Sequence, residues 1–555
     1  MLSNTDITIN EGLAEAGELQ AEAAALSGGG GKAPSHGGRI AKAAVVLMAG
    51  TILSRVVGVG RESSIAYLFG GGVEVGAFTI ANHVATIVYD LLIAGTVSAA
   101  LVPVLSEYAQ REDQRAEFGK VLGTVMTIAA LFLVGSVAVL EVFAEPLANF
   151  MSAGYPDEAR ALALVMTQWV LPGVFFMGMS GVVMASLYAL NRFVYPAFTS
   201  VLFNLAIIAC AFALAGVLGV KALALGLVVG AIAMLVFQLP GLRDVPIRPG
   251  LDMGHPAVRK ILRLYAPVGL SVVVSSIALV IDRNLASQVG EGAIGAMRYA
   301  TTLVQFGLGM VAAAISLAAL PSLSQHFSNR NAAAYNRTLA TGLRLVTVMV
   351  LPAAAMLLAL AVPLVNLLFF HGAFTQADAN LTVLALMLYV IGLPFSAIDQ
   401  VLLFAFYARK NTLTPALIGV AQFGVYLTIA FATYRTWGMP GLVIANSAQL
   451  AFHALVTAFF LWRAMRADGG LGGYGIVATA LKALGASAAL GLASYATWWA
   501  LSGAVPGDGF VGEVVLLGVP ALVGGAVYAA LVWSMRLPEV ELVLANVRAR
   551  LGRGR

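Results

Sequence analysis

Charged side chains are scarce in this sequence: Asp, Glu, Lys and Arg make up 11% of its 555 residues, whereas 60% are hydrophobic. Soluble globular domains carry about 25% charged residues. The shortage excludes an ordinary soluble domain and indicates a protein of the lipid bilayer. The formal net charge of +5 does not indicate a nucleic-acid partner, because the basic residues lie in short loops between apolar runs.

Cysteine and catalytic signatures are also nearly absent. Cys210 is the one cysteine, so no internal disulfide or cysteine metal cluster can form, and its apolar surroundings predict a packing residue. The sequence contains no His-Glu-x-x-His, no phosphate-binding loop with its lysine, and no paired carboxylates on one predicted helix face. The glycine run 70–72 predicts a turn between helices. These absences favour a transporter over an enzyme, with no metal site and no cofactor.

The first 38 residues are polar, are acidic up to Glu22, and end in a run rich in glycine. This composition has too few large apolar side chains to bury a core. We expect a disordered cytoplasmic tail over residues 1–38. No basic segment followed by a short apolar run and a cleavage site is present, which argues against a cleaved signal peptide.

A nearly unbroken series of apolar stretches follows the tail, and each is long enough to cross roughly 30 Å of hydrocarbon. Their continuous apolar character excludes membrane β-strands, which alternate polar and apolar residues. The sequence therefore predicts an all-α polytopic membrane protein with about 14 transmembrane helices. We expect the helices at residues 41–68, 76–106, 120–142, 161–187, 194–216, 220–240, 257–283, 293–323, 339–361, 380–407, 414–434, 440–464, 476–501 and 511–535.

The basic residues alternate between loops, and cytoplasmic loops normally hold the excess of Lys and Arg. A cytoplasmic N-terminus leaves little more than Arg160, Lys221 and Arg435 outside. With an even number of helices, this alternation predicts that both termini are cytoplasmic. The basic residues assigned to the cytoplasmic side are Arg111, Arg115, Lys120, Arg192, Arg243, Arg248, Arg259, Lys260, Arg263, Arg330, Arg337, Arg344, Arg409, Lys410, Arg463, Arg466, Arg548, Arg550, Arg553 and Arg555.

The two halves of the chain contain an internal repeat. Residues 187–202 resemble residues 406–421, with Pro196 and Pro415 separated by 219 positions. Because a six-helix unit begins and ends on the same side of the membrane, its two copies are parallel repeats. Parallel lobes around a central cavity favour a carrier with alternating access. The expected domains are the tail 1–38, an N-terminal six-helix lobe 39–241, a C-terminal six-helix lobe 242–467, two further helices 468–540, and a basic cytoplasmic tail 541–555.

Ionisable residues are concentrated in the first two predicted helices, where lipid-facing segments would carry none. They are Arg55, Arg61, Glu62, His83 and Asp90. Such groups cost a few kcal/mol each at bilayer depth and usually face a bundle interior or a wet cavity. Arg55 and Arg61 lie on one broad side of their helix, and a guanidinium group is well suited to bind phosphate oxygens. We expect a cavity for an anionic headgroup. The alternatives are arginines that pair with Glu62 and Asp90 as structural ties, and a hydrogen-bonded core histidine.

A second set of ionisable residues lies in the C-terminal half. Asp282 and Arg283 end the seventh predicted helix, Arg298 enters the eighth, and Asp399 lies in the tenth. Asp282 and Arg283 form either a local ion pair or part of a ligand site. Asp399 is either a packing partner or a gating group. We therefore predict gating or charge pairing for Glu62, Asp90, Asp282, Arg283 and Asp399.

Taken together, several segments resemble the MurJ (MviN) family of lipid II flippases, within the multidrug/oligosaccharidyl-lipid/polysaccharide exporter superfamily. The segments that carry the resemblance are SRVVGVGRESSIAYLFGGG at 54, GAFTIANH at 76, AGTVSAALVPVLSEY at 94, DRNLASQVGEGAIGAMRYATTL at 282, ALPSLSQ at 319, LFFHGAF at 368 and FYARKNTLTPA at 406. The resemblance covers residues from about 41 to 540, and the fourteen-helix count agrees with it.

The resemblance implies transport of an undecaprenyl-diphosphate-linked peptidoglycan precursor from the inner to the outer leaflet. It implies a cationic central cavity for the diphosphate and a groove for the lipid tail near helices thirteen and fourteen. Ser54, Arg55 and Arg61 match the family's first-helix serine and arginines, and His83 falls where a basic residue is common. We therefore assign Ser54, Arg55, Arg61, His83 and Arg298 to the diphosphate cavity.

This chain departs from the family pattern at four positions. Gly76 replaces an aspartate, Tyr89 and Asp90 replace an arginine pair, and Thr302 replaces an arginine of the eighth helix. Arg298 lies four residues before Thr302, one helical turn away on the same face. We hypothesise that its guanidinium group restores the lost charge.

The function we expect is a lipid II flippase of the bacterial cytoplasmic (inner) membrane, working by alternating access of two lobes. It needs no cofactor, and a membrane potential or an ion gradient could drive it. The expected partners are the undecaprenyl-diphosphate-linked glycan, the lipid bilayer and cell-wall synthesis proteins. The alternatives are an exporter of another lipid-linked oligosaccharide or of a drug, and a non-transporting scaffold for envelope synthesis.

Overall fold

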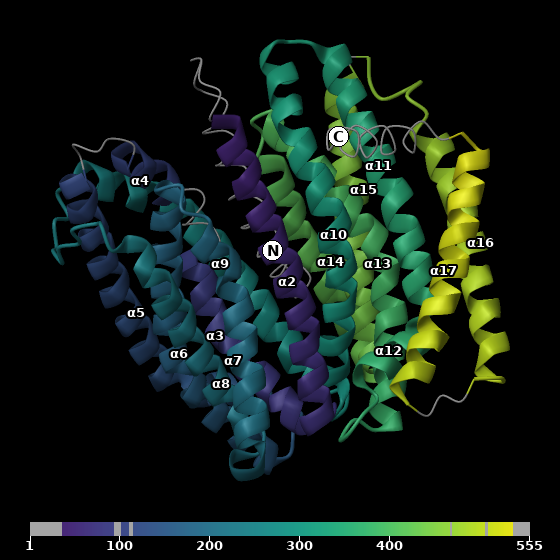
Figure 1. Cartoon of the computed structure of the whole chain (residues 1–555), viewed down its shortest axis with the longest axis horizontal. Coiled ribbons are helices and arrows are strands. Elements are labelled where there is room, and N and C mark those ends of the chain that lie inside the picture. The colour runs from purple at the N-terminus through teal and green to yellow at the C-terminus, as the bar shows by residue number, and fades with distance from the viewer. Residues whose placement is uncertain (1–35, 94–100, 110–114, 467–468, 506–508, 537–555) are drawn as a thin grey trace. The chain divides into compact units, whose positions relative to one another are not determined.

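The computed structural model in Figure 1 describes residues 36–93, 101–109, 115–466, 469–505 and 509–536. The predicted basic tail 541–555 lies outside the described residues, as does the predicted disordered tail up to residue 35. The first described helix begins at His36, three residues inside the segment expected to be tail.

The described residues form helices and contain no strand, as expected for an all-α protein. The helices of the first half are α2 (His36–Phe69), α3 (Val73–Ile93), α4 (Val102–Ala109), α5 (Arg115–Met151), α6 (Asp157–Ala189), α7 (Val194–Leu218), α8 (Lys221–Gln238), the 3₁₀ turn η3 (Leu239–Leu242) and α9 (Pro256–Ser287). The second half contains α10 (Ala293–Ser328), α11 (Ala332–Ala359), α12 (Ala361–Phe369), α13 (Gln376–Ala408), α14 (Leu413–Trp437), α15 (Met439–Met465), α16 (Ile476–Ser502) and α17 (Phe510–Ser534).

Ten of the described helices are long and apolar enough to cross a membrane. They are α5, α6, α7, α8 with η3, α11, α13, α14, α15, α16 and α17. The residues predicted for the diphosphate cavity lie on three other helices, α2, α3 and α10. The protein is therefore a polytopic helical membrane protein. The count of fourteen spans stays a prediction.

The described chain forms two compact units. The first runs to Tyr299 and includes Gly372–Asp378, and the second comprises Ala300–His371 and the residues from Ala379 onward. In the first unit α6 packs against α3, α5 and α8, while α7 packs against α2 and α8. In the most apolar 18-residue stretch of α6, 78% of the residues are buried, whereas in that of α5 only 11% are. Helix α6 is thus interior to its unit, and α5 presents its apolar surface outward.

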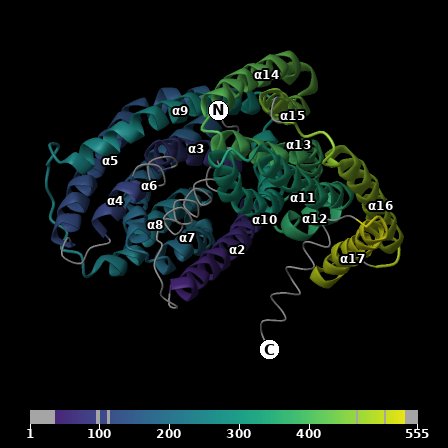
Figure 2. The ribbon, with the colours of Figure 1, turned by 90° about the horizontal axis from the view of Figure 1, so that it is seen from above.

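In the second unit, α16 and α17 lie side by side (Figure 1, Figure 2), and α16 also packs against α11. A small apolar cluster joins the three helices through Val348, Ala483, Ala486 and Val532. The Tyr528 hydroxyl donates a hydrogen bond of 2.5 Å to the Val348 carbonyl oxygen. The two C-terminal helices are therefore attached to the second unit through α11. Their proposed role as a lipid-tail groove stays a prediction.

The helix bounds repeat with the spacing seen in the sequence. Helices α6 and α13 differ by 219 at both ends, and so do α7 and α14. The left-handed residues that follow also correspond: Asn191 and Lys410 both have φ of 57°. Glycines 219 and 438, with φ of 56° and 65°, end α7 and α14. The two halves thus repeat the same helix lengths and turn conformations in these segments. The boundaries predicted for the two lobes stay a prediction.

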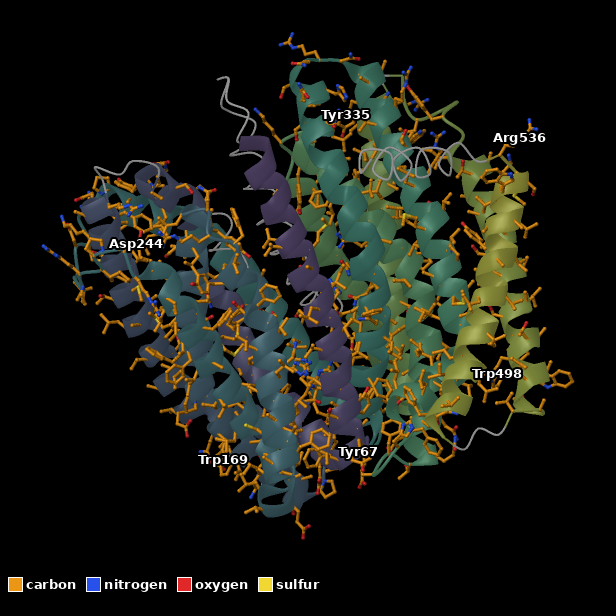
Figure 3. The ribbon with its side chains drawn as sticks, in the orientation of Figure 1. Tyr67, Trp169, Asp244, Tyr335, Trp498 and Arg536 are labelled. Atoms are coloured by element: carbon orange, nitrogen blue, oxygen red, sulfur yellow. The ribbon has the colours of Figure 1, made fainter. Side chains whose placement is uncertain are left out.

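The loops predicted to be cytoplasmic meet at one end of the first unit. Asp244 accepts hydrogen bonds of 2.5 and 2.7 Å from Arg192 and one of 3.0 Å from Arg115. The Arg192 guanidinium lowers the pKa of Asp244 to about 2. In Figure 3, Asp244 lies at the opposite end of this unit from Tyr67 and Trp169. One end of the unit therefore carries the clustered basic loops.

Candidate functional site

The centre of the candidate site is Glu62, a carboxylate of α2 whose side chain is 1% exposed. Its neighbour Arg61 donates to Glu62 Oε1 from Nη2 at 2.6 Å and from Nε at 3.1 Å. From the start of α10, Arg298 donates to Oε2 from Nε at 2.7 Å and to Oε1 from Nη2 at 2.9 Å. One buried carboxylate thus holds two guanidinium groups that are 237 positions apart in the chain.

Arg298 is held on its other sides by α3. Its Nη1 donates to Thr79 Oγ1 at 3.3 Å, and its guanidinium carbon lies 5.0 Å from the centre of the Phe78 ring. A cation near an aromatic face is attracted by the ring's negative face. Arg298 is 10% exposed, so its charge is nearly desolvated. The hydrogen bonds to Glu62, the Phe78 ring and the Thr79 hydroxyl compensate for the lost contact with water.

Arg61 is less enclosed, because 24% of its side chain is exposed. Its Nη1 donates to Asn204 Oδ1 of α7 at 2.8 Å. Asn204 is a polar residue in an otherwise apolar helix, and this contact satisfies it. Arg61, Glu62 and Arg298 together carry one net positive charge. Since Arg61 is the most open of the three, it is the one best placed to meet an anion.

The turn that aligns α2 with α3 is fixed from the start of α10. Gly70 has φ of 71°, a left-handed conformation that favours glycine. Its carbonyl oxygen accepts a hydrogen bond of 2.7 Å from the buried Tyr299 hydroxyl, one residue after Arg298. The glycine run is therefore a turn between helices, as predicted, and it anchors the segment that carries Arg298.

The remaining residues assigned to the diphosphate cavity lie along α2 and α3. Ser54 and Arg55 are partly exposed. They precede Arg61 by seven and six residues, which places them about 9 to 10 Å along the helix axis. His83 is partly exposed, and its Nδ1–H donates to the Thr79 carbonyl oxygen at 2.6 Å. The structure therefore brings Arg61 and Arg298 together, while Ser54 and Arg55 lie further along the same helix.

Tyr155 explains the glycine at position 76. This tyrosine lies in the loop between α5 and α6 and is 2% exposed. A Cβ atom on Gly76 would lie 2.0 Å from its hydroxyl oxygen, so a larger side chain fits only if Tyr155 moves. Burial raises the pKa of Tyr155, which keeps the hydroxyl protonated. The neutral phenol of Tyr155 thus lies against position 76, where the family has an aspartate.

Arg283 of α9 is the largest fully buried side chain described, at 1% exposed. Its Nη2 lies 3.3 Å from Asp282 Oδ2, so these two neighbours form an ion pair in this structure. Its Nε and Nη1 have no hydrogen-bond partner among the described residues. Arg283 and Arg298 are both electrostatic neighbours of His83. The first unit therefore holds two buried guanidinium groups near His83, each paired with a carboxylate.

Two of the predicted acidic residues are not part of this group. Asp90 is 8% exposed and lies two turns beyond His83 on α3. Asp399 belongs to the second unit, where its Oδ2 lies 2.8 Å from Nδ1 of His453. The partners that sequence reasoning missed are Thr79, Asn204, Tyr155 and His453. Asn204 and His453 stand out in the sequence only as polar residues within apolar runs.

Known proteins resemble this chain over most of its length. A family model described as lipid II flippase MurJ matches residues 65–519. A probable lipid II flippase MurJ of Vibrio cholerae is 31% identical over 445 residues, which cover 78% of this chain and 84% of that protein. The lipid II flippase MurJ of Burkholderia cenocepacia is 31% identical over 421 residues, covering 73% and 80%.

Solved structures show the same fold. A structure of the lipid II flippase MurJ in an inward closed conformation matches with a TM-score of 0.73 at 24% identity, covering 88% of this chain and 98% of that one. An inward-facing multidrug resistance transporter of the MATE family, in the MOP superfamily, matches with a TM-score of 0.58 at 19% identity, covering 76% and 94%. The family model and the relatives span most of the length of this chain. The chain belongs to the lipid II flippase MurJ family.

Proposed function

We propose that this protein is a flippase that carries lipid II, the undecaprenyl-diphosphate-linked peptidoglycan precursor, from the inner to the outer leaflet. The supporting comparisons are the family match over residues 65–519 and the relatives named as lipid II flippases. The supporting observation in the structure is the Arg61–Glu62–Arg298 cluster, a buried charged group inside a helical membrane protein.

The cluster suits a diphosphate for a physical reason. Guanidinium groups bind phosphate oxygens through paired N–H donors, and a low-dielectric surrounding strengthens those bonds. Arg61 and Arg298 already present such pairs of donors to the two oxygens of Glu62. A diphosphate offers the same kind of acceptor with more negative charge. It therefore competes with Glu62 for donors that the fold has already oriented.

Glu62 makes this competition reversible. When cargo leaves, the carboxylate takes back the guanidinium groups, so neither arginine remains buried without a partner. Leaving a buried charge unpaired costs about 3 to 5 kcal/mol. Because cargo and Glu62 exchange the same donors, we propose that cargo binding changes the contacts between α2 and the start of α10. Those changing contacts connect cargo binding to alternating access of the two lobes.

The orientation follows from the basic loops. We propose that the end of the first unit bearing Arg115, Arg192 and Asp244 faces the cytoplasm, with both termini on that side. The protein then lies in the bacterial cytoplasmic membrane as a multi-pass carrier rather than an enzyme. It needs no cofactor, and a membrane potential or ion gradient drives it. Cell-wall synthesis proteins that use the cargo outside are the partners we propose.

Complementation of a flippase-depleted bacterium tests this function. The wild-type chain should restore growth and clear the accumulated inner-leaflet lipid II, whereas Arg61→Gln and Arg298→Lys should not. Lysine keeps the positive charge of Arg298 but loses the paired N–H donors of its planar guanidinium group. Arg160→Gln is the matched control, since Arg160 pairs with the exposed Asp157 outside the cluster.

The competing functions predict different results. A scaffold for envelope synthesis would let both arginine variants restore growth as well as the wild type does. An exporter of a drug or of another lipid-linked oligosaccharide would leave inner-leaflet lipid II accumulated even with the wild-type chain. Either result would overturn the proposed function.

A further inference from the structure

We propose that His453 and Asp399, in the second unit, form the proton-binding site that couples transport to a proton gradient. This inference rests on the proposed function and names its driving ion. His453 is on α15 and Asp399 on α13, and Nδ1 of the imidazole lies 2.8 Å from Oδ2 of the carboxylate. The side chains are 9% and 15% exposed, so the pair is largely shielded from water.

The internal repeat shows that packing alone does not require ionisable groups here. At a spacing of 219, Asp399 corresponds to Ser180, and Thr457 corresponds to Gln238. In the first unit, Gln238 Nε2 donates to Ser180 Oγ at 2.5 Å, which joins α6 to α8. That neutral hydrogen bond is buried, so the first unit makes this contact between its two helices without an ionisable group. The second repeat has instead placed a carboxylate at this position.

The histidine departs from the repeat in the same way. At the same spacing, His453 corresponds to Met234 of α8, an apolar residue. In the second repeat an imidazole faces the new carboxylate, and Thr457 Oγ1 lies 3.4 Å from His453 Nδ1. Two titratable residues thus replace two uncharged ones at equivalent places on the same pair of helices. A role beyond holding α13 to α15 accounts for both changes together.

Among the described residues, the other charged groups of α13, α14 and α15 lie near the helix ends. Asp378 is in the first turn of α13, Arg435 in the last turn of α14, and Arg463 in the last turn of α15. Tyr407, also on α13, is a further titratable residue close to Asp399. The Oδ1 atom of Asp399 is buried and accepts no hydrogen bond from the described residues. The imidazole is therefore the cationic partner that the structure offers to this carboxylate.

A single proton changes the net charge of this pair. Without it, the pair is a carboxylate and a neutral imidazole, with one net negative charge. With it, the proton lies between Nδ1 and Oδ2 and the pair is neutral. A net charge in the low-dielectric interior is costly, whereas a neutral hydrogen-bonded pair is tolerated. Closure of the helices around the pair therefore favours the protonated form.

This preference gives the direction of coupling. A carrier that has released its cargo outside must close around the pair to return, so it returns only after binding a proton from the exterior. Opening toward the cytoplasm exposes the pair to water, and the proton leaves to bulk solvent. Histidine is suited to such exchange because it titrates near physiological pH. Proton entry is thereby linked to lipid exit.

The experiment uses the purified full-length chain in vesicles containing lipid II, oriented in one direction, with the membrane potential clamped at zero. The acid side corresponds to the cell exterior. If one proton is coupled to each lipid, one pH unit should shift the steady-state outer-to-inner ratio of lipid II about tenfold. Asp399→Asn should still flip lipid II but show no shift, because without the carboxylate no negative charge is left for a proton to neutralise. Asn keeps an oxygen that accepts a hydrogen bond from the imidazole.

Two further proteins keep this test sound. His371→Gln is the matched control, because His371 also pairs with a carboxylate, at 3.1 Å from Glu513 Oε2, but is 41% exposed. It should keep the tenfold shift. The triple variant Asp399→Ser, His453→Met, Thr457→Gln recreates the neutral contact of the first repeat. It should fold, flip lipid II and ignore the gradient.

The outcomes separate the two proposals. If the wild type flips lipid II but its distribution ignores the pH gradient, the proton site is wrong and the flippase function stands. If Asp399→Asn keeps the tenfold shift, the proton binds elsewhere and the inference is also overturned. If the wild type moves no lipid II with or without a gradient, the proposed function fails and the proton site falls with it.

Discussion

The hydroxyl of Tyr155 fills the space beside Gly76 so closely that a Cβ atom there would lie 2.0 Å away. The two residues come from different parts of the first unit, the loop after α5 and the first turn of α3. Gly76, which stands where the family has an aspartate, is thus a glycine that packs closely against Tyr155. The contact also ties the loop to the helix that carries Thr79 and His83.

We predict that Gly76→Ala destabilises the protein by about 1 to 3 kcal/mol, the usual cost of overpacking a well-filled core. Gly60→Ala on α2 is the control, because nothing lies within 4 Å of a Cβ atom there. Thermal unfolding in detergent measures both. Tyr155→Phe in the Gly76→Ala background should recover part of the loss, because it removes the closest atom. Equal stability of the Gly60 and Gly76 variants would contradict the packing account.

We predict that Glu62→Gln lowers stability by about 3 to 5 kcal/mol, since it leaves the buried Arg298 without its carboxylate. Arg298→Gln alone should cost a similar amount by leaving Glu62 unpaired. The double variant should be more stable than the sum of the two single losses implies. A double-mutant cycle on unfolding temperatures checks this coupling. Additive losses would show that the two side chains act independently.

The loop at the basic end of the first unit should depend on pH. The pKa of Asp244 is lowered from 3.8 to about 2, chiefly by its hydrogen bonds to Arg192. A lowered carboxyl pKa stabilises the folded loop above pH 4, and this contribution is lost as the pH falls from about 4 to about 2. Hydrogen exchange at pH 5 and pH 3 measures it. The wild-type loop should lose protection over this range, whereas Asp244→Asn should be less protected at pH 5 and change less.

Removing the Tyr528 hydroxyl should loosen α17. Its hydrogen bond to the Val348 carbonyl joins α17 to α11 and is partly buried. A typical hydrogen bond contributes about 0.5 to 1.5 kcal/mol, so Tyr528→Phe should lower stability by that amount. Faster hydrogen exchange confined to α16 and α17 would support the account. Tyr495→Phe is the control, because Tyr495 is exposed, and unchanged exchange in Tyr528→Phe would contradict it.

Helices could be predicted from the sequence wherever a long apolar run is enough to require a helix. An apolar run that can cross the bilayer must satisfy its own backbone, so residues 194–216 became α7 at Val194–Leu218. The predicted helix 339–361 ended close to the break at Leu360, but the short helix α12 that follows it was not predicted. The repeat was visible because its prolines and turn residues are local signals.

The site was only partly predictable, for a different physical reason. Helical periodicity shows which residues share a face but not which residues of a distant helix meet that face. Arg61 and Arg298 were singled out as cavity residues because charge is rare in these helices. Their shared carboxylate and the bond from Arg61 to Asn204 depend on how α2, α7 and α10 pack. No local pattern in the sequence encodes that packing.

The central claim is that the arginines on Glu62 bind the diphosphate of lipid II during transport. The most direct measurement is lipid II flipping by the reconstituted full-length chain, comparing wild type, Arg61→Gln, Arg298→Lys and Arg160→Gln. We predict that wild type and Arg160→Gln flip lipid II, and that Arg61→Gln and Arg298→Lys are at least about tenfold slower, as expected if each loses 1.4 kcal/mol of binding. Wild-type rates in all four folded proteins would contradict the account.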